Sequence, residues 1–237
     1  NGWIFCLFRQ EAINKEKLSY FTNLAHEFKT PLTLIQGPAS QLVRQTTDPK
    51  EKEDLQIINR NAQYLLSLVN QLIDLRKIDT QNLTLNYSQF NFSKFLNTTT
   101  TDFSSLMKER NISFEKIYRL KSDHIYSDKE NLHKILFNLL SNAIKHTPDK
   151  GKITLHANQF IDKSNKLMQF ISVTNSGSII APDEIDKIFN RFYRIPEQNK
   201  YTNYGQSSTG IGLHIVKELI NLLGGTIKVK SSEKVGV

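Results

Sequence analysis

A histidine with potential reaction partners stands early in the chain. His26 is followed directly by Glu27, and Thr30 lies four positions later on the same face of a helix. A nucleophile, an acid and a hydroxyl are therefore within reach of one another. Pro31, one residue further on, removes a backbone hydrogen bond and can bend the helix beside the reacting group. These residues favour a nucleophilic site, and the structural alternative is an ordinary kinked coiled coil.

Two asparagines occur four residues apart in the run FNLLSNAIKHT. Asn138 and Asn142 share one helical face, although asparagine side chains prefer caps and turns to helix interiors. Such a pair needs polar partners, and a hydrated magnesium ion with nucleotide phosphates would supply them. Lys145 would add a positive charge for the phosphates. The alternative is a pair of surface asparagines on an amphipathic helix.

Glycines are few in this chain, yet four of the ten gather around one helix near the C-terminus, at Gly210, Gly212, Gly224 and Gly225. The residues from Thr209 to Gly212 stand where a loop becomes a helix, so backbone N–H groups and the positive helix end can meet a phosphate. Neither GxxxxGKS nor GxGxxG occurs in the sequence, which disfavours the common P-loop and dinucleotide-binding folds.

Apolar residues at helical spacing predict two long helices in the first third of the chain. One stripe runs from Leu18 to Leu42 and the other from Leu55 to Leu72, with a turn at 46–49 between them. The two helices are therefore expected to be antiparallel. Because a helix pair alone leaves much apolar surface exposed, we expect two copies to form a four-helix bundle, which makes the protein a homodimer.

The pattern changes to short mixed segments after residue 79, so a second domain is expected to begin near residue 80. The spacing predicts helices near 92–109 and after Asp128, an alternating segment at 83–90, and strands at 112–118, 153–159 and 168–174. Helices packed against one mixed sheet would make an α+β sandwich. The polar residues 196–208, between two well-patterned helices, are typical of a mobile loop or lid.

Composition narrows the class of protein. The 237 residues allow one or two domains, and 38% hydrophobic content is typical of a folded chain. The single cysteine, Cys6, excludes an internal disulfide framework and a cysteine-based metal cluster and favours a reducing compartment. The net charge of +8 is spread among acids without a long basic run, which gives little support to nucleic-acid binding.

One apolar cluster, residues 3–8, is far shorter than the roughly 20 residues that span a membrane. Arg9 follows it directly, as a basic residue would where a spanning helix leaves the bilayer on its cytoplasmic side. The chain is therefore expected to begin just below a membrane.

Five runs occur in a fixed order: HEFKTPLT, NLLSNAIKHT, VTNSGSII, IFNRFYR and TGIGL. Their order and spacing resemble the cytoplasmic transmitter of a bacterial sensor histidine kinase, and the resemblance covers nearly the whole chain. The runs YFTNLA and HEFKTPLTLI look most like the hybrid two-component sensors. The resemblance implies an α+β multidomain protein, with a helical hairpin that forms a dimeric four-helix bundle and then an α/β sandwich of the GHKL, or Bergerat, ATPase type.

The resemblance also implies a division of the chain. Residues 1–79 would be the dimerisation and histidine phosphotransfer hairpin, with 1–8 a candidate for the end of a transmembrane helix. Residues 80–237 would be the catalytic ATP-binding domain, whose last strand is expected to be truncated after Val237. The activity implied is that of a protein-histidine kinase that uses ATP and Mg²⁺.

Roles for individual residues follow from the same resemblance. His26 is the implied phosphoacceptor, Glu27 orients it and accepts its proton, and Thr30 helps to place the water that dephosphorylates a partner. Asn142 is the implied magnesium ligand, with Asn138 in support. The remaining residues of the implied ATP site are Lys145, which touches phosphate, His146, in a place usually aromatic, Asn175, Gly177, Phe189, Arg191, Phe192, Thr209, Gly210 and Gly212.

Partners and location are implied as well. The phosphoryl group would pass to an aspartate on a response-regulator receiver domain, in cis or in trans. The chain would be the cytoplasmic portion of an inner-membrane protein, held at the membrane by a preceding segment and without direct nucleic-acid contact.

The sequence departs from the family pattern in its glycine boxes. Asn175 stands where the family usually has the aspartate that accepts a hydrogen bond from adenine, and Ile179 and Ser208 each replace a glycine. A neutral acceptor binds less strongly than a charged one, so ATP affinity is expected to fall several-fold. These departures favour one alternative, a degenerate transmitter that acts mainly as a phosphatase or scaffold. A further alternative, from another class, is a helical dimerisation module whose basic surface binds nucleic acid or anionic lipid.

Overall fold

The computed structural model describes residues 25, 27–80, 82–163, 165–195, 209–232 and 236–237. The chain folds as two compact units, Asn1–Leu83 and Thr84–Val237. Among the described residues, no helix is long and apolar enough to cross a membrane.

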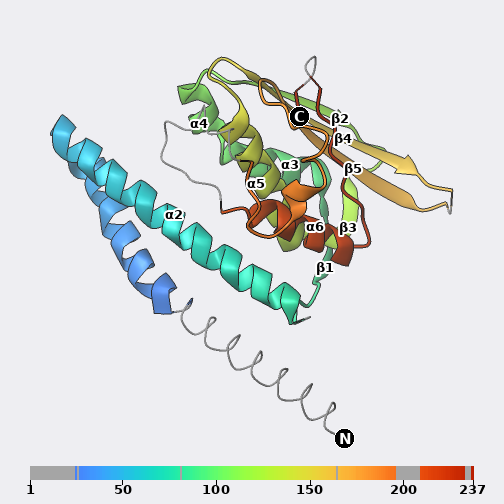
Figure 1. Cartoon of the computed structure of the whole chain (residues 1–237), viewed down its shortest axis with the longest axis horizontal. Coiled ribbons are helices and arrows are strands. Elements are labelled where there is room, and N and C mark those ends of the chain that lie inside the picture. Colours follow the sequence, from blue (N-terminus) through green and yellow to red (C-terminus); the bar gives the residue numbers. More distant parts are fainter. Residues whose placement is uncertain (1–24, 26, 81, 164, 196–208, 233–235) are drawn as a thin grey trace, which may run out of the picture. The chain divides into compact units, whose positions relative to one another are not determined.

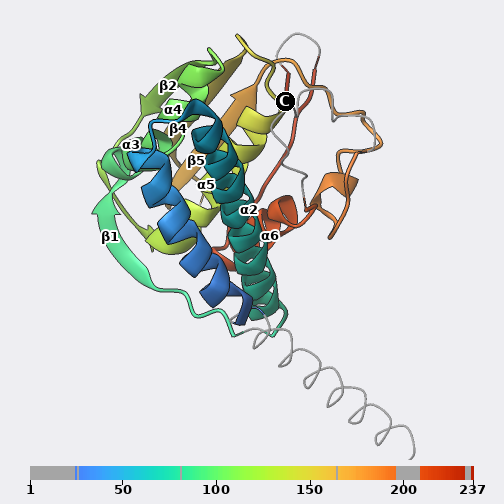
Figure 2. The same cartoon turned by 90° about the vertical axis from the view of Figure 1, so that its left-hand side faces the viewer.

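The first unit is a helical hairpin. Residues 27–45 are helical, residues 46–48 form the connection, and α2 (Pro49–Asp79) follows. Asp48 caps α2, because its carboxylate accepts hydrogen bonds from the backbone N–H groups of Lys50 at 2.8 Å and Glu51 at 3.5 Å. Pro49 begins the helix, where its missing N–H costs nothing. Figure 2 shows the two helices side by side, and the predicted antiparallel hairpin is confirmed.

Small side chains and a polar contact join the two helices. Ala39 and Ala62 are buried, and Ser40 Oγ donates a hydrogen bond to Asn59 Oδ1 across the hairpin at 2.9 Å. Large apolar side chains remain exposed on both helices in this single chain: Phe28, Leu34, Ile35, Leu42, Ile57, Ile58, Leu65 and Leu72. The hairpin therefore buries only part of its apolar surface, as the sequence predicts.

The second unit contains two sheets in its described part. Strands β1 (Tyr87–Asn91) and β3 (His124–Asp128) form an antiparallel pair. Strands β2 (Ser113–Arg119), β4 (Lys152–Ile161) and β5 (Leu167–Asn175) form a mixed sheet in the order β2-β4-β5, in which only β2 and β4 are parallel. The prediction of one mixed sheet is wrong for these residues. The β1–β3 strand pair is short because the last residue of each strand caps the helix that follows it. The side chain of Asn91 accepts a hydrogen bond from Lys94 N, and that of Asp128 accepts one from Asn131 N.

Helices α3 (Phe92–Thr101), α5 (Lys129–His146) and α6 (Gly212–Leu222) lie on one face of the three-stranded sheet (Figure 1). The core between helices and sheet is built largely from fully buried side chains: Phe92, Leu96, Leu136, Leu140, Ile153 and Leu155. The layered α/β architecture expected from the sequence is thus confirmed, and α5 is its central helix.

Two predicted helices differ in the structure. The helix expected near 92–109 is interrupted at Asp102 and Phe103, and α4 (Ser104–Glu109) follows the break. Threonines at the end of α3 explain the interruption, since Thr100 and Thr101 hydroxyls both donate to Asn97 O and compete with the helical backbone. The residues before 196 form only a short 3₁₀ helix, η1 (Lys187–Phe189), rather than the predicted longer helix.

Candidate functional site

The predicted nucleophile, His26, lies outside the described residues. Its predicted partners Glu27 and Thr30 are both exposed on the first helix of the hairpin. Pro31 lies within the same helix, where its ring removes one backbone donor. Because the structure does not describe the imidazole, its role as phosphoacceptor stays a prediction.

The two asparagines of α5 have different surroundings. Asn138 Nδ2 donates to Lys134 O within the helix at 2.8 Å. A Cβ atom added at Gly212 would lie 2.9 Å from Asn138 Oδ1, so the first residue of α6 approaches α5 very closely. The half-buried Asn142 side chain makes no hydrogen bond within the described part of the chain. Of the two amides, that of Asn142 therefore has its oxygen available to a ligand.

Positive charge collects at the C-terminal end of α5. Burial, together with the charge of nearby Arg194, lowers the pKa of Lys145 to about 8. Burial and the charge of Lys145 likewise hold the pKa of His146 below its usual range. Among the described residues no carboxylate forms an ion pair with Lys145 or Arg194. Two basic groups that pair with no carboxylate of the described segments make this a place where an anion is stabilised.

A buried arginine holds the end of α5 that carries this charge. Arg110, which is 5% exposed, donates from Nη1 to Ile144 O at 2.6 Å and from Nη2 to Thr147 O at 2.7 Å. Its Nε donates to Asp149 Oδ1 at 2.8 Å. The guanidinium satisfies carbonyl groups that a helix end otherwise leaves open. Arg110 thereby fixes the backbone on both sides of Lys145 and His146.

The loop after β5 packs against the same end of α5. Gly177 adopts a φ of 92°, and a Cβ atom there would lie 2.4 Å from Pro148 Cδ. Ser176 Oγ accepts a hydrogen bond from Lys152 N at 2.8 Å, which ties the loop to the start of β4. Glycine is needed at 177 because no side chain fits in this contact. The loop therefore packs Gly177 against the turn that follows Lys145 and His146.

The two segments that flank residues 196–208 are bound to each other. Phe192 N donates to Gly210 O at 3.0 Å, and a Cβ atom at Gly210 would lie 2.6 Å from Phe192 C. Thr209 Oγ1 accepts from Ile211 N at 3.1 Å and shapes the turn into α6. Phe189 is buried, whereas Phe192 is exposed. The predicted site residues Phe192 and Gly210 thus contact each other through their backbones.

His214 links these segments through both ring nitrogens. Its Nδ1 lies 3.1 Å from Phe189 O, and its Nε2 lies 2.8 Å from Arg191 Nε. Because a carbonyl only accepts and the guanidinium only donates, the tautomer with its proton on Nδ1 satisfies both contacts. His214 therefore connects α6 to the segment that carries Arg191.

Sequence reasoning missed Arg110, Arg194 and His214. Arg194 could have been found from the sequence, because it is the second arginine of the run IFNRFYR, whose first arginine, Arg191, was predicted as a site residue. Nothing in the local pattern marked Arg110 or His214. The partners of Arg110 lie 34 to 39 residues away along the chain, and those of His214 lie 23 to 25 residues away.

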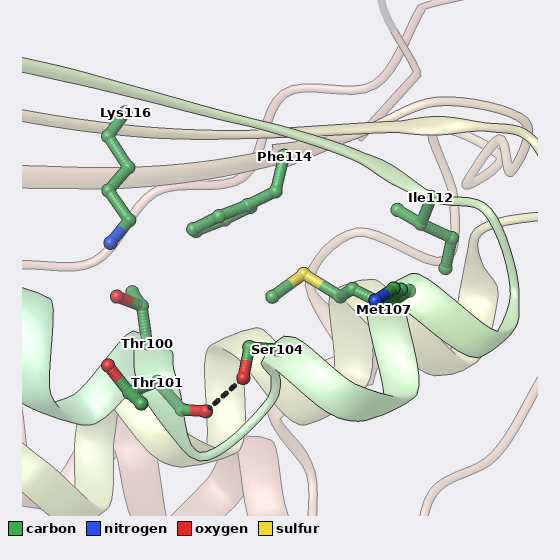
Figure 3. Close-up of a pocket in the computed structure, with 8 residues that line it drawn as sticks. Thr100, Thr101, Ser104, Met107, Ile112, Phe114 and Lys116 are labelled. Carbon is green, nitrogen blue, oxygen red and sulfur yellow. Dashed lines mark hydrogen bonds between the residues drawn. The ribbon is translucent and has the colours of Figure 1, made fainter.

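A separate groove of about 390 Å³ lies between α3, α4 and β2 (Figure 3). Met107, Ile112 and Phe114 supply apolar surface, and the amine of Lys116 extends toward Thr100. Burial lowers the pKa of Lys116. None of the residues predicted from the sequence to bind nucleotide lines this groove.

Family models match both parts of the chain. Residues 16–81 match the His Kinase A (phospho-acceptor) domain. Residues 127–237 match the histidine kinase-, DNA gyrase B-, and HSP90-like ATPases. The two matches appear in the order that the sequence motifs predict.

Curated relatives are similar over nearly all of this chain. Histidine kinase P4 of Formosa agariphila is 38% identical over 232 residues, which are 96% of this chain and 16% of the relative. Hybrid signal transduction histidine kinase D of Dictyostelium discoideum is 32% identical over 218 residues, or 92% of this chain and 14% of the relative. The chain thus spans less than a fifth of the length of these two relatives.

Solved structures share the fold. ShkA, determined at full length in complex with AMPPNP, matches 92% of this chain and 43% of its own with a TM-score of 0.69 at 25% identity. Histidine kinase ThkA, determined in complex with response regulator TrrA, matches 96% of this chain and 63% of its own with a TM-score of 0.59 at 24% identity. A helical hairpin followed by an α/β ATPase domain is common to the matches.

Proposed function

Because the chain belongs to the sensor histidine kinases of two-component signalling, with a phosphoacceptor domain followed by an ATPase domain, we propose that ATP bound in its second unit phosphorylates His26. Residues 1–79 would act as the phosphoacceptor hairpin and residues 80–237 as the ATP-binding domain. The observation that carries the proposal is the positive charge of Lys145 and Arg194, without a carboxylate partner in the described residues, at the end of the helix that bears the two asparagines.

Several neighbouring groups support nucleotide binding at this place. Lys145 and Arg194 would hold phosphate oxygens, and Thr209, Gly210 and Gly212 open α6, whose positive end favours an anion. Arg191 and Phe192 would belong to the same nucleotide site. The AMPPNP bound to ShkA supports the same assignment by analogy.

The donor chemistry also fits a magnesium ion. Asn142 offers an amide oxygen that is not used in the described part of the chain, and Mg²⁺ prefers oxygen ligands. Asn138, whose amide is bonded to Lys134 O, would act only by supporting the helix pair. When bound, the ion would neutralise charge on the phosphates.

The chain's own residues would carry the transfer as follows. A neutral His26 nitrogen attacks the γ-phosphorus in line, the new N–P bond forms, and the bond to the ADP oxygen breaks. Glu27 orients the ring and accepts the proton that the imidazole loses. Thr30 would help to place the water that dephosphorylates a partner. The phosphoryl group would then pass to an aspartate of a receiver domain, a partner class supported by the complex of ThkA with TrrA.

Two copies of the chain would assemble through the hairpin. Its eight exposed large apolar side chains support a four-helix bundle, because pairing two such faces removes them from water. The relatives' names as sensor kinases further support a place at the cytoplasmic side of an inner membrane in the full-length protein.

A second function is favoured by one observation. Asn175 replaces a charged acceptor and is buried, so the nucleobase would find only a neutral partner there. A transmitter with weakened ATP binding would act mainly as a phosphatase or scaffold.

Calorimetric titration with ATP in the presence of Mg²⁺ separates these functions. We expect binding by the parent chain and its loss in Asn142→Ala, while Asn221→Ala, an exposed asparagine of α6, binds like the parent. Absence of binding by the parent would exclude the kinase and leave the scaffold.

A further inference from the structure

His214 lies in the first turn of α6 and joins this helix to the segment that follows η1. Its Nδ1 lies 3.1 Å from Phe189 O, and its Nε2 accepts a hydrogen bond from Arg191 Nε at 2.8 Å. Phe189 is 8% exposed, and the amine of Lys217 lies 5.9 Å from the centre of its ring. The carbonyl that His214 contacts is therefore fixed by packing. Arg191, in contrast, is an exposed side chain that the contact with His214 helps to hold.

The hydrogen bond to Arg191 depends on a lone pair at Nε2 of His214. A guanidinium has only donors, so the ring nitrogen that bonds to it acts as the acceptor. An imidazolium carries a proton on both nitrogens and has no acceptor. Two N–H groups cannot face each other across the 2.8 Å between Arg191 Nε and His214 Nε2, and the two positive charges would repel. Protonation of His214 therefore breaks this contact, while the bond to Phe189 O can persist.

The charged groups near His214 come from three elements, because α6 packs mainly against α5 and η1. On α5, the relevant face is the one that carries Asn138, the residue beside Gly212. The groups are Lys187 of η1, Arg191 just after it, Lys217 and Glu218 of α6, and Lys134 and Lys145 of α5. In the described part of the chain, Glu218 is the one carboxylate of this set, and no ion pair joins it to His214. An imidazolium beside Arg191 would therefore lack a paired negative charge.

We propose that His214 is a positioning residue, whose neutral ring orients Arg191 toward the nucleotide and whose protonation releases Arg191 and weakens ATP binding. The inference rests on the proposed function, in which Arg191 belongs to the nucleotide site. A guanidinium is planar, so fixing the direction of its Nε–H also fixes the directions of both Nη groups. His214 thereby orients the donors and the charge that Arg191 offers to an anionic ligand.

The consequence is an ATP affinity that depends on pH. The charge of histidine side chains commonly changes between about pH 5 and 8. As the pH falls through this range, a growing fraction of the chains carries an imidazolium at position 214 and loses the oriented Arg191. The contribution of this contact to ATP binding is therefore present in neutral and alkaline solution and is lost in acid.

The test measures the dissociation constant of ATP with Mg²⁺ by calorimetry on the whole chain, at about pH 8 and at about pH 6. His214→Gln is the decisive variant, because its amide oxygen accepts from Arg191 at either pH and does not titrate. Between the two pH values, we expect the affinity of the parent to fall at least about threefold more than that of His214→Gln. Protonation of ATP and of the other histidines is common to both proteins and cancels in the comparison.

Two further variants test whether His214 acts through Arg191. His214→Ala removes the acceptor and should weaken ATP binding about three- to tenfold at the higher pH, the usual effect of one hydrogen bond to a charged group. Introduced into Arg191→Ala, the same change should have little further effect, because the two residues act as a pair. His124→Ala, at an exposed histidine of β3, is the matched control and should keep the parent's affinity and its pH dependence.

The results that would overturn the inference differ from one another. Equal pH dependence in the parent and His214→Gln, with ATP bound by both, removes the role of the ring and leaves the proposed function intact. A full additional loss of affinity from His214→Ala in the Arg191→Ala background shows a merely structural role and also contradicts the inference. Absence of ATP binding by the parent at the higher pH removes the proposed function as well. If either His214 variant does not fold, the pH dependence of the other decides, since neither alanine nor glutamine titrates.

Discussion

Lys145 is half-buried and has no carboxylate partner in the described residues, so its titration makes the stability of the folded protein depend on pH. Its pKa is lowered to about 8, first by burial and then by Arg194. In the unfolded chain the pKa of the lysine lies near its ordinary value of 10.5. Between these values the unfolded state binds more protons, so this group's contribution to the free energy of unfolding rises as pH increases from about 8 to 10.5. Below that window the folded protein keeps a charge that burial disfavours.

Binding of a polyphosphate at Lys145 should therefore take up protons. Phosphate charge favours the ammonium form and raises its pKa, so about half a proton per site is expected near pH 8, where about half of the unliganded lysines are neutral. Calorimetry of ATP binding in two buffers with different ionisation enthalpies measures this uptake. Lys145→Arg keeps the charge but does not titrate, so its uptake should be near zero. Equal proton uptake on ATP binding by the parent and by Lys145→Arg would show that Lys145 does not bind the phosphates.

Arg110 acts on the same region through the backbone. Arg110→Met should lower the free energy of unfolding by about 2–4 kcal/mol. The carbonyl of Thr147 would lose its donor inside the protein, and that of Ile144 would keep only the 3.3 Å bond from Thr147 N. Urea denaturation measures the change. Arg119→Met, at an exposed arginine of β2, should change the same quantity by less than about 0.5 kcal/mol. Similar losses in the two variants would contradict a specific role for Arg110.

The helical hairpin leaves much of its apolar surface exposed in the single chain, which supports the proposed pairing of two copies. Its helices contact each other through small residues such as Ala39 and Ala62, while larger apolar side chains remain exposed. A second hairpin with the same stripe is the simplest cover for this surface.

Leu65→Asp should weaken the dimer because a charge would enter its apolar interface. Leu65 is 46% exposed in the single chain. We expect the dimer dissociation constant to rise at least about tenfold, as for burial of an uncompensated charge. Sedimentation analysis over a range of concentrations provides the measurement. Gln63→Asp, at an exposed polar position of the same helix, serves as the control. A parent chain that remains monomeric at all concentrations would rule out the proposed bundle.

Element boundaries were predictable where the signal is local. Asp48 with Pro49 marks the start of α2, and Asp128 marks the start of α5, since capping depends on adjacent residues. The break after Thr101 and the separation of β1–β3 from the larger sheet were not predicted. Both depend on competition between side-chain and backbone hydrogen bonds or on strand pairing across distant residues, which periodicity does not report.

Across the whole chain, the order of the chemical groups was predictable and their supports were not. The spacing of Asn138, Asn142 and Lys145 is by itself enough to predict that they share one helix, α5. The guanidinium of Arg110 and the ring of His214 act across the fold, so only the structure identifies them. The motif residues mark where chemistry is expected, and residues distant in sequence hold them in position.

The proposed reaction uses groups from both units, because a nucleotide bound in the second unit would phosphorylate a histidine of the first. The most direct test is the intact mass of the purified chain after incubation with ATP and Mg²⁺, beside a His26→Gln variant, with part of each sample treated with acid. We expect one added phosphate that is acid-labile and present on the parent alone. No added phosphate on the parent, or the same phosphate on His26→Gln, would contradict the proposed reaction.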